Sequence, residues 1–286
     1  MGVPIKHINI SLESVSCPFC QSNESNHWVT ENGFNAVKCR ECGLIYVNPR
    51  NIQSVVDKAV TTGHHSEVPG GRNVVGRRSK RKVLKYRRVL SALFKDVWSA
   101  NRTISWLDIG AGFGEIVEAL SSLAPKGSQV HGIEPMGPKA QNAQSRGILV
   151  REGYLNSVKE SYDFVSLVDV FSHLPDFRQF LLEIKNVLND GGQIYLQTGN
   201  IADLRGSNDV PTQLDLPDHL VFAGEKHIIA YLEEAGFKII EIVRVRNDTF
   251  VNLLKSLIRK IQGRQIALVF PGTSEYRSLR IRAQLT

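Results

Sequence analysis

The sequence has 286 residues and a formal net charge of +7, and 42% of its residues are hydrophobic. Such a chain is long enough for one large domain plus a smaller attachment, and its composition is ordinary for a globular protein. No window approaches the roughly 18 consecutive apolar residues of a membrane span, and the N-terminus lacks the layout of a signal peptide, so we expect a cytoplasmic protein.

All four cysteines lie within the first 42 residues, as the pairs Cys17/Cys20 and Cys39/Cys42 with 18 residues between them. Each pair offers two thiolates on a tight turn, and two such turns close a tetrahedral four-cysteine zinc site. We therefore predict a zinc ribbon over residues 1–50. The metal would be structural, because four cysteines leave no coordination position for chemistry. Two disulfides are the alternative, which a reducing cytoplasm disfavours.

Residues 51–100 are predicted to form a basic helical linker or cap. They begin as a polar loop, in which His64 and His65 are not expected to belong to a site, and continue as a helix from about Ser79 to Trp98. The stretch 72–88 contains no acidic residue and carries these cations: Arg72, Arg77, Arg78, Lys80, Arg81, Lys82, Lys85, Arg87 and Arg88. This pattern is typical of a solvated helix face, and it also suits contact with nucleic acid or another polyanion.

Strands and helices alternate from about residue 104 onward. Apolar runs predict strands at Ile104–Ile109, Gln129–Glu134, Ile148–Val150, Tyr162–Val170, Gln193–Thr198 and Phe237–Val245. The intervening patterns predict helices at Glu115–Leu123, Pro138–Arg146, Phe177–Leu188 and Glu225–Ala235. We expect a Rossmann-like α/β domain over residues 101–286, with a mainly parallel sheet and helices on both faces. A helix at Phe250–Ile261 and a short strand at Gln265–Phe270 would add a final antiparallel strand.

A glycine-rich turn, Leu107–Gly114, follows the first strand of this domain, where ligands bind in open parallel sheets. Its spacing is G-x-G-x-G, and Glu115 stands where a dinucleotide-binding turn needs its third glycine. A carboxylate there would face the pyrophosphate of a dinucleotide. The turn therefore favours S-adenosylmethionine, which has no phosphate and carries an ammonium and a sulfonium. Glu134 ends the second strand and suits hydrogen bonds to ribose hydroxyls, which both cofactor types possess.

Together these segments resemble the class I S-adenosylmethionine-dependent methyltransferases over roughly residues 104–245. The resemblance includes Leu107–Gly114, Glu134, Tyr162–Leu174 and Leu188–Leu196. It implies cofactor contacts from Asp108, Gly110 and Gly112 at the methionine end, Glu134 at the ribose, Pro135, Met136, Gly153, Tyr154 and Leu155 near the adenine, and Asp169, Val170 and His173 at the mouth shared with the substrate. A catalytically inactive Rossmann-like domain, or one that binds another nucleotide, is the alternative.

Two further runs, Cys42–Arg50 and Asp218–Phe222, resemble a bacterial subfamily of zinc-ribbon methyltransferases. Many members lie among genes for sugar, surface-glycan or secondary-metabolite synthesis, which implies a small-molecule acceptor. The chain departs from that subfamily at Ser172, where an acidic residue is usual, and at Gly199, where Pro-Asn is frequent instead of Gly-Asn. Both positions lie near the expected acceptor, so the acceptor type stays open. The insertion at about 200–223 is predicted to be a substrate lid.

Methyl transfer is an in-line displacement that needs an aligned nucleophile and, for a hydroxyl or acidic C–H acceptor, a general base. His219 and His173 are the candidates, since each is expected in a loop at the carboxyl edge of the sheet. A structural histidine that bonds a backbone carbonyl is the alternative for either. We predict methyl transfer to a sugar, a nucleotide-sugar or a related intermediate. An RNA methyltransferase that uses the ribbon and the basic stretch, and a non-catalytic S-adenosylmethionine-binding protein, are the alternatives.

Overall fold

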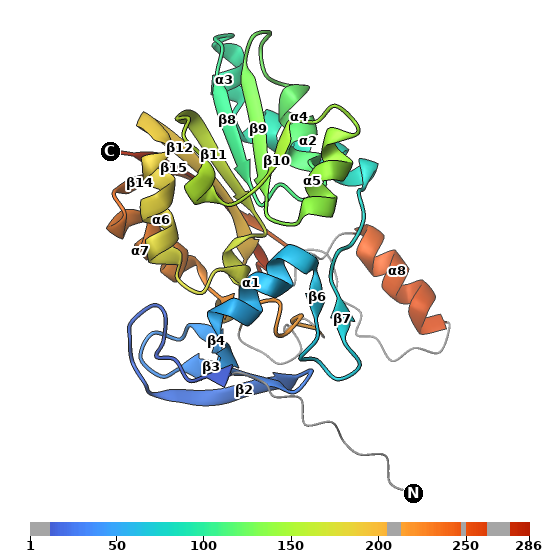
Figure 1. Cartoon of the computed structure of the whole chain (residues 1–286), viewed down its shortest axis with the longest axis vertical. Helices are drawn as coiled ribbons and strands as arrows, with labels where there is room; N and C mark the ends of the chain where they lie inside the picture. Colours follow the sequence, from blue (N-terminus) through green and yellow to red (C-terminus); the bar gives the residue numbers. More distant parts are fainter. Residues whose placement is uncertain (1–11, 205–212, 247–249, 262–274) are drawn as a thin grey trace, which may run out of the picture.

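A seven-stranded sheet forms the centre of the computed structural model, which describes residues 12–204, 213–246, 250–261 and 275–286 (Figure 1). The strand order is β10-β9-β8-β11-β12-β15-β14, and β15 runs antiparallel to both of its neighbours. The strands are β8 (Ser105–Ile109), β9 (Gln129–Glu134), β10 (Val150–Glu152), β11 (Tyr162–Val168), β12 (Leu188–Gly199), β14 (Phe237–Val245) and β15 (Ser278–Leu285). The five strands from β10 to β12 are parallel, so their carboxyl ends share one edge of the sheet.

Helices cover both faces of this sheet, which confirms the predicted fold class. Two separate apolar cores show the two layers, one around Trp106 and Phe164 and the other around Leu167 and Leu196. The helices of the first layer are α2 (Lys80–Leu93), α3 (Lys95–Ser99), α4 (Glu115–Ser121) and α5 (Gly137–Gln144). Those of the second layer are α6 (Phe177–Asn186) and α7 (Glu225–Glu234). Strand β11 is buried between the layers, as its almost continuous apolar sequence requires.

The C-terminal part differs from the prediction in one strand. Helix α8 (Phe250–Ile261) has the predicted bounds. The predicted strand Gln265–Phe270 lies outside the described residues. The final antiparallel strand of the described chain is Ser278–Leu285, in which small and apolar side chains alternate with arginines.

The cysteine-rich segment forms a small antiparallel sheet that a distant part of the chain completes. Its order is β13-β4-β3-β2, with β2 (Ser25–Glu31), β3 (Phe34–Cys39), β4 (Ile45–Val47) and β13 (Val221–Phe222). Two short strands, β1 (Leu12–Glu13) and β5 (Arg50–Asn51), pair beside it. Because β13 comes from the predicted lid insertion, the ribbon and that insertion share one sheet.

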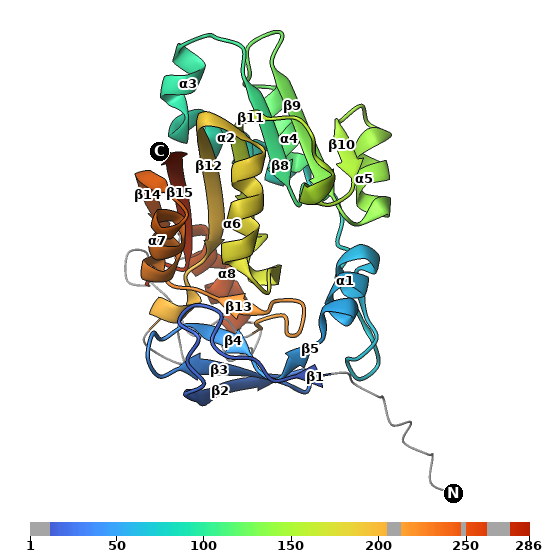
Figure 2. The same ribbon diagram turned by 60° about the vertical axis from the view of Figure 1, so that its left-hand side comes forward.

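The linker runs from the ribbon to the large sheet, and its first helix lies between the two (Figure 2). It consists of α1 (Gln53–Thr62), the paired strands β6 (His64–His65) and β7 (Arg72–Asn73), and then α2. Helix α2 begins at Ser79, whose side chain accepts a hydrogen bond from the backbone N–H of Lys82. Among the described residues, no helix is both long and apolar enough to cross a membrane.

Candidate functional site

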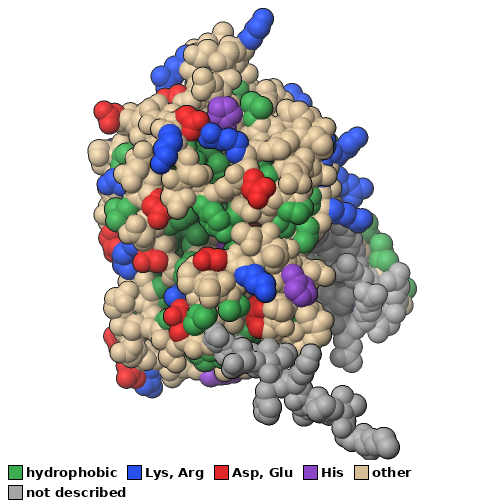
Figure 3. Space-filling model, viewed as in Figure 1, with side chains coloured by type: hydrophobic (Ala, Val, Ile, Leu, Met, Phe, Trp, Pro, Cys, Tyr) green, Lys and Arg blue, Asp and Glu red, His purple; other side chains and the backbone are tan. Residues whose placement is uncertain are grey.

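A cavity of about 800 Å³ opens at the carboxyl ends of β8, β9 and β11, beneath α1. In the space-filling view this face is hollowed, and hydrophobic side chains gather in the hollow between the sheet and α1 (Figure 3). The predicted cofactor residues that line the cavity are Gly110, Gly112, Glu134, Pro135, Met136, Gly153, Tyr154, Leu155, Asp169 and Val170. His173 also lines it. The structure thus brings these sequence-distant residues together.

The first glycine of the turn approaches its neighbour too closely for a side chain, and the second does not. Gly110 has a φ of 69°, and a Cβ there would lie 2.6 Å from Cγ2 of Val170. Gly112 has a φ of 55°, but nothing lies within 4 Å of its ideal Cβ position. The first glycine therefore permits close packing, whereas the second faces open space along the cavity.

Glu134 bridges the glycine turn and the next loop. Its Oε2 accepts a hydrogen bond from the backbone N–H of Gly112 at 2.7 Å, and its Oε1 accepts one from Met136 N–H at 3.0 Å. The residue is only 5% exposed, so these bonds fix the orientation of its carboxylate.

Asp108 does not line the cavity, unlike the other predicted cofactor residues. Its carboxyl is buried behind the turn and accepts a hydrogen bond of 2.6 Å from Ser166 Oγ, which in turn accepts one from Trp106 Nε1 at 3.0 Å. Burial raises the pKa of Asp108 to about 8, and the Glu134 and Glu115 carboxylates act in the same direction. In the structure this side chain links β8 to β11 within the sheet.

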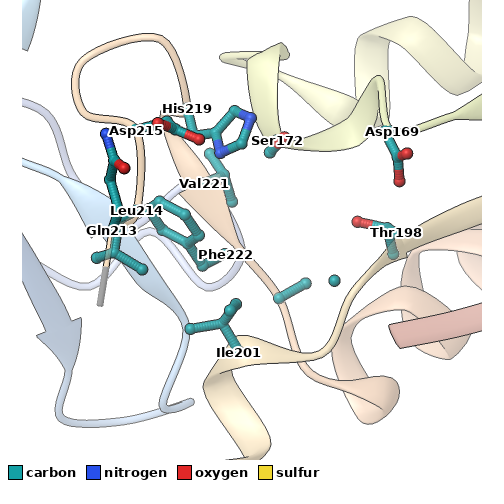
Figure 4. Close-up of a pocket in the computed structure, with 12 residues that line it drawn as sticks. Asp169, Ser172, Thr198, Ile201, Gln213, Leu214, Asp215, His219, Val221 and Phe222 are labelled. Atoms are coloured by element: carbon teal, nitrogen blue, oxygen red, sulfur yellow. The ribbon is translucent and has the colours of Figure 1, made fainter. Parts of the chain in front are cut away.

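A second cavity, of about 190 Å³, lies beside the first and shares Asp169 with it. His219 and Ser172 lie at one wall, and Asp169 and Thr198 lie at the opposite one (Figure 4). The remaining lining residues are Gly199, Ile201, Gln213, Leu214, Asp215, Val221, Phe222 and Ala223. Aspartates are therefore the charged side chains of its described lining, apart from any charge on His219.

The two candidate histidines lie against each other, one at each cavity. The rings of His173 and His219 are edge to face, with centroids 4.7 Å apart. His173 Nδ1 donates a hydrogen bond of 2.8 Å to the backbone carbonyl of Asp218 and lies 3.6 Å from the Asp218 carboxylate. His173 thus has the carbonyl partner of a structural histidine and also lines the cofactor-sized cavity.

His65 is buried and continues this network, so the prediction of a polar loop there is wrong. Its Nε2 lies 3.2 Å from the Asp218 carboxylate, and its Nδ1 lies 2.9 Å from Glu67 Oε1. Glu67 also accepts a hydrogen bond from Asn51, which belongs to the ribbon strand β5. Sequence periodicity cannot predict this contact, because residues 65 and 218 lie far apart in the chain.

The surroundings of the two histidines shift their pKa values in opposite directions. Burial lowers the pKa of His219, and the neighbouring His173 lowers it further. Burial would also lower the pKa of His173, but its hydrogen bonds to Asp218 outweigh burial and raise it. Burial would raise the pKa of Asp218, but His173 and His65 hold it well below its usual range. The geometry therefore favours a neutral His219 beside an ion-paired His173.

Two groups of described residues bring potential metal ligands within 4.8 Å of one another. One is the cysteine set, in which Cys17 Sγ lies 3.5 Å from Cys42 Sγ and Cys20 Sγ lies 3.5 Å from Cys39 Sγ. The other is His173, Asp218 and His219, in which His173 already bonds the backbone carbonyl of Asp218 and His65 lies against the Asp218 carboxylate. The cysteine set has the donor chemistry and spacing of a tetrahedral site.

Several lining residues were not predicted from the sequence. In α1 these are Gln53, Val56, Asp57 and Val60, which close the large cavity. The helical spacing of the apolar residues in 55–60 could have identified α1, although not the surface that it covers. In the small cavity the missed residues include Thr198, Gln213, Leu214 and Asp215.

Comparison with known proteins agrees with this architecture. A model of the methyltransferase domain family matches residues 78–242. Ubiquinone biosynthesis O-methyltransferase from Aeromonas salmonicida (strain A449) is 30% identical over 104 residues, which make up 33% of this chain and 42% of that relative. The match thus spans less than half of the length of that relative.

Solved structures with low sequence identity share the fold. A candidate sarcosine dimethylglycine methyltransferase from Galdieria sulphuraria has a TM-score of 0.53 at 15% identity, with 73% of this chain and 92% of that chain covered. A SAM-dependent methyltransferase from Archaeoglobus fulgidus has a TM-score of 0.50 at 17% identity, with 69% and 94% covered. Because the family model spans more than half of the chain, the protein belongs to the methyltransferase domain family.

Proposed function

We propose that the protein transfers the methyl group of S-adenosylmethionine to a neutral, hydroxyl- or amine-bearing small molecule of the sugar type, with His219 as the general base. One observation carries the proposal: the large cavity at the glycine turn and the small cavity beside His219 share Asp169. A donor in the first cavity and an acceptor in the second would meet at one point, as in-line displacement requires.

The lining of the large cavity suits the cofactor. A carboxylate offers about four lone-pair positions, and Glu134 uses two of them for backbone N–H groups, which leaves the others for the ribose hydroxyls. Pro135, Met136 and Leu155 provide apolar surface for an adenine. Asp169 at the shared edge favours the positive charge of the methionine end.

The lining of the small cavity favours an uncharged ring. Its volume of about 190 Å³ is below the roughly 300 Å³ at which sites for drug-sized ligands begin, so one ring-sized group would fill it. Leu214 and Phe222 give it an apolar side, and Thr198, Ser172 and Asp215 offer polar contacts. Phosphate or carboxylate groups on that ring would meet Asp169 and Asp215, and no described lysine or arginine lines the cavity. In a nucleotide-sugar, the nucleotide would therefore lie outside this cavity.

The basic stretch supports a small acceptor over RNA. None of its cations lines either cavity in the described chain. Arg72 pairs with Asp215 and Arg78 pairs with Glu118, so two of them hold other elements in place. The exposed cations of α2 belong to the helix layer of the large sheet, in the half of the molecule away from the ribbon (Figure 1).

His219 would take the proton that the acceptor loses. A histidine with a lowered pKa is neutral at pH 7 and can accept a proton. When the acceptor attacks the methyl group, the bond between that methyl group and the sulfur of S-adenosylmethionine would break and leave S-adenosylhomocysteine. The proton of the acceptor's O–H or N–H group would pass to a ring nitrogen of His219. S-adenosylmethionine supplies an activated methyl group, so the remaining tasks of the protein are alignment and the exclusion of water.

The cysteine set is proposed to hold one structural zinc ion. Zinc–sulfur bonds of about 2.3 Å in a tetrahedron need sulfurs a little under 4 Å apart, close to the separations between the four thiols. Four thiolates leave no open position, so the ion would stabilise the ribbon rather than take part in methyl transfer.

Mass-spectrometric detection of methylated products from a panel of sugars tests the proposal. We expect methylation of neutral sugars or amino sugars, and none on a ring that carries a phosphate. His219→Ala should lower turnover about 10²- to 10⁴-fold, with cofactor affinity unchanged by calorimetry. His64→Ala is the matched control, because His64 is exposed. Unchanged turnover in His219→Ala, or a preference for ring phosphates, would contradict the proposal.

In the wild-type enzyme the acidic limb of the rate profile should reflect His219. Because its pKa lies below the ordinary value of 6.5, turnover should persist at pH 6.5 and fall as the pH drops through that lowered pKa. The pH dependence of kcat/KM gives the measurement, because this ratio reports the pKa values of the free enzyme. An acidic limb centred above 6.5 would exclude His219 as the base.

A further inference from the structure

We propose that Glu31, at the end of the ribbon strand β2, is a positioning residue that holds the wall of the acceptor cavity. The ribbon would then help to position the residues of the acceptor site. The acceptor cavity is the small cavity described above. This name rests on the proposed function, whereas the contacts of Glu31 do not depend on that function.

The carboxylate of Glu31 accepts hydrogen bonds from three consecutive backbone N–H groups. Its Oε2 accepts from Leu214 N–H at 2.7 Å, and its Oε1 accepts from Asp215 N–H at 2.9 Å and from Leu216 N–H at 3.2 Å. Successive backbone N–H groups that converge on one anion form a nest, in which each hydrogen bond is charge-assisted. The bound segment includes Leu214 and Asp215, both of which line the small cavity.

Neighbouring side chains fix the same segment from two more directions. Asn32, next to Glu31 in the hairpin, donates a hydrogen bond of 2.6 Å from its side-chain amide to the backbone carbonyl of Leu216. Arg72 from β7 lies 3.7 Å from the Glu31 carboxylate and forms an ion pair with Asp215. Both the backbone and the side chain of Asp215 are therefore oriented by residues outside the methyltransferase sheet.

The ribbon also holds the other end of this loop. Val221 and Phe222 pair with Tyr46 and Ile45 in the ribbon sheet. The backbone N–H of Val47 donates a hydrogen bond of 2.9 Å to the carbonyl of Leu220. His219 thus lies between two anchors that both belong to the ribbon.

The placement of Glu31 predicts a selective defect when its carboxylate is removed. Hydrogen bonds to a charged group are roughly twice as strong as those between neutral groups, so loss of even one should raise the exchange of the Leu214–Leu216 amides about tenfold or more. Glu134 and Gly112 belong to a different cavity wall, and S-adenosylmethionine affinity should stay within about twofold. A ribbon residue that only supports folding would affect both cavities alike.

Hydrogen–deuterium exchange of wild type, Glu31→Ala, Glu31→Gln and Glu24→Ala tests the assignment. Glu24 is the matched control, because this ribbon glutamate is 68% exposed and pairs only with Arg40 among the described contacts. We expect faster exchange at 214–216 in Glu31→Ala, a smaller effect in Glu31→Gln, and none in Glu24→Ala. Zinc content and calorimetric S-adenosylmethionine affinity should be the same in all four.

A second readout concerns the ligand of the cavity. Saturation-transfer NMR with glucosamine as the probe should show weaker binding to Glu31→Ala than to Glu24→Ala. Unchanged exchange at 214–216, or an equal loss of zinc, cofactor affinity and exchange protection, would overturn the assignment. If no sugar binds even the wild type while exchange behaves as expected, the sugar proposal fails and the role of Glu31 in holding the loop stands. If Glu31→Ala does not fold, the same comparison is made with Glu31→Gln.

Discussion

At the scale of single residues, carboxylates do the positioning on both sides of the site. Glu134 joins the glycine turn to the loop after β9, and Glu31 joins the ribbon to the loop before His219. Each binds backbone N–H groups, so each fixes the path of the main chain rather than a single side chain. A carboxylate can do this because its two oxygens accept several hydrogen bonds at once.

Glu134→Ala should weaken S-adenosylmethionine binding about 10- to 100-fold. The variant loses the acceptor for the ribose and leaves the Gly112 and Met136 N–H groups without their bonds. The rate constant of the bound complex should change less than the affinity, because Glu134 lies away from His219. Calorimetry and single-turnover kinetics separate the two quantities. Equal affinity in the variant and the wild type would show that this carboxylate does not contact the cofactor.

His65→Ala should destabilise the protein in a pH-dependent way. Burial lowers the pKa of His65, but hydrogen bonds to Asp218 and Glu67 outweigh burial and raise it. A raised folded-state pKa gives stability that is fully present below the ordinary value of 6.5 and is lost as the pH rises through the folded-state pKa. The loss of unfolding free energy in His65→Ala should thus be larger at pH 6 than at pH 9.

Urea unfolding at the two pH values measures this difference, with His64→Ala as the neighbouring exposed control. A destabilisation by His65→Ala that is independent of pH would mean that His65 is buried as a neutral ring. The sequence alone did not reveal this residue, because its partners lie 2 and 153 positions away and only the tertiary fold brings the distant one near.

At the scale of elements, the features that could be predicted are those that a local sequence pattern determines. The strands around the glycine turn, helix α8 and the cysteine pairs follow from apolar periodicity and spacing. Helix α1 and strand β13 were not predicted. Strand β13 has only two residues and takes its structure from pairing with β4, which the local sequence does not indicate. The predicted lid is still a prediction, but its described end at 213–222 is bonded to the ribbon.

Gly110→Ala tests the close packing between the glycine turn and the loop after β11. A methyl group would lie 2.6 Å from Val170 Cγ2, at a φ of 69° that non-glycine residues seldom adopt. We expect a destabilisation of about 1–3 kcal/mol and a strong loss of cofactor binding. The double variant Gly110→Ala/Val170→Ala should recover part of the stability, because only the steric share is relieved. Gly76→Ala is the control, since its φ is 68° and no atom lies within 4 Å of its ideal Cβ.

At the scale of the whole molecule, the acceptor cavity is built from three parts of the chain. The carboxyl edge of the sheet supplies Asp169 and Thr198, the insertion supplies Asp215 and His219, and the ribbon holds that insertion in place. The large cavity, where the methyl donor is proposed to bind, depends instead on the glycine turn and α1. Sequence patterns could assign the donor side, because its residues follow successive strands. The acceptor side depends on contacts between residues about 180 positions apart.

This division predicts that metal loss affects the two cavities unequally. Elemental analysis should find one zinc per chain, and Cys39→Ser should lower it. Because β3 carries Cys39 and pairs with β4, which pairs with β13, the defect should reach His219 through the ribbon sheet. Exchange protection at 214–222 and methylation of the acceptor should both fall. S-adenosylmethionine affinity should remain within about twofold, since no described hydrogen bond joins the glycine turn to the ribbon sheet. A folded, fully active Cys39→Ser protein without zinc would show that the acceptor site does not depend on the zinc-bound ribbon. Equal loss of acceptor binding and cofactor binding would mean that the chain folds as one cooperative unit.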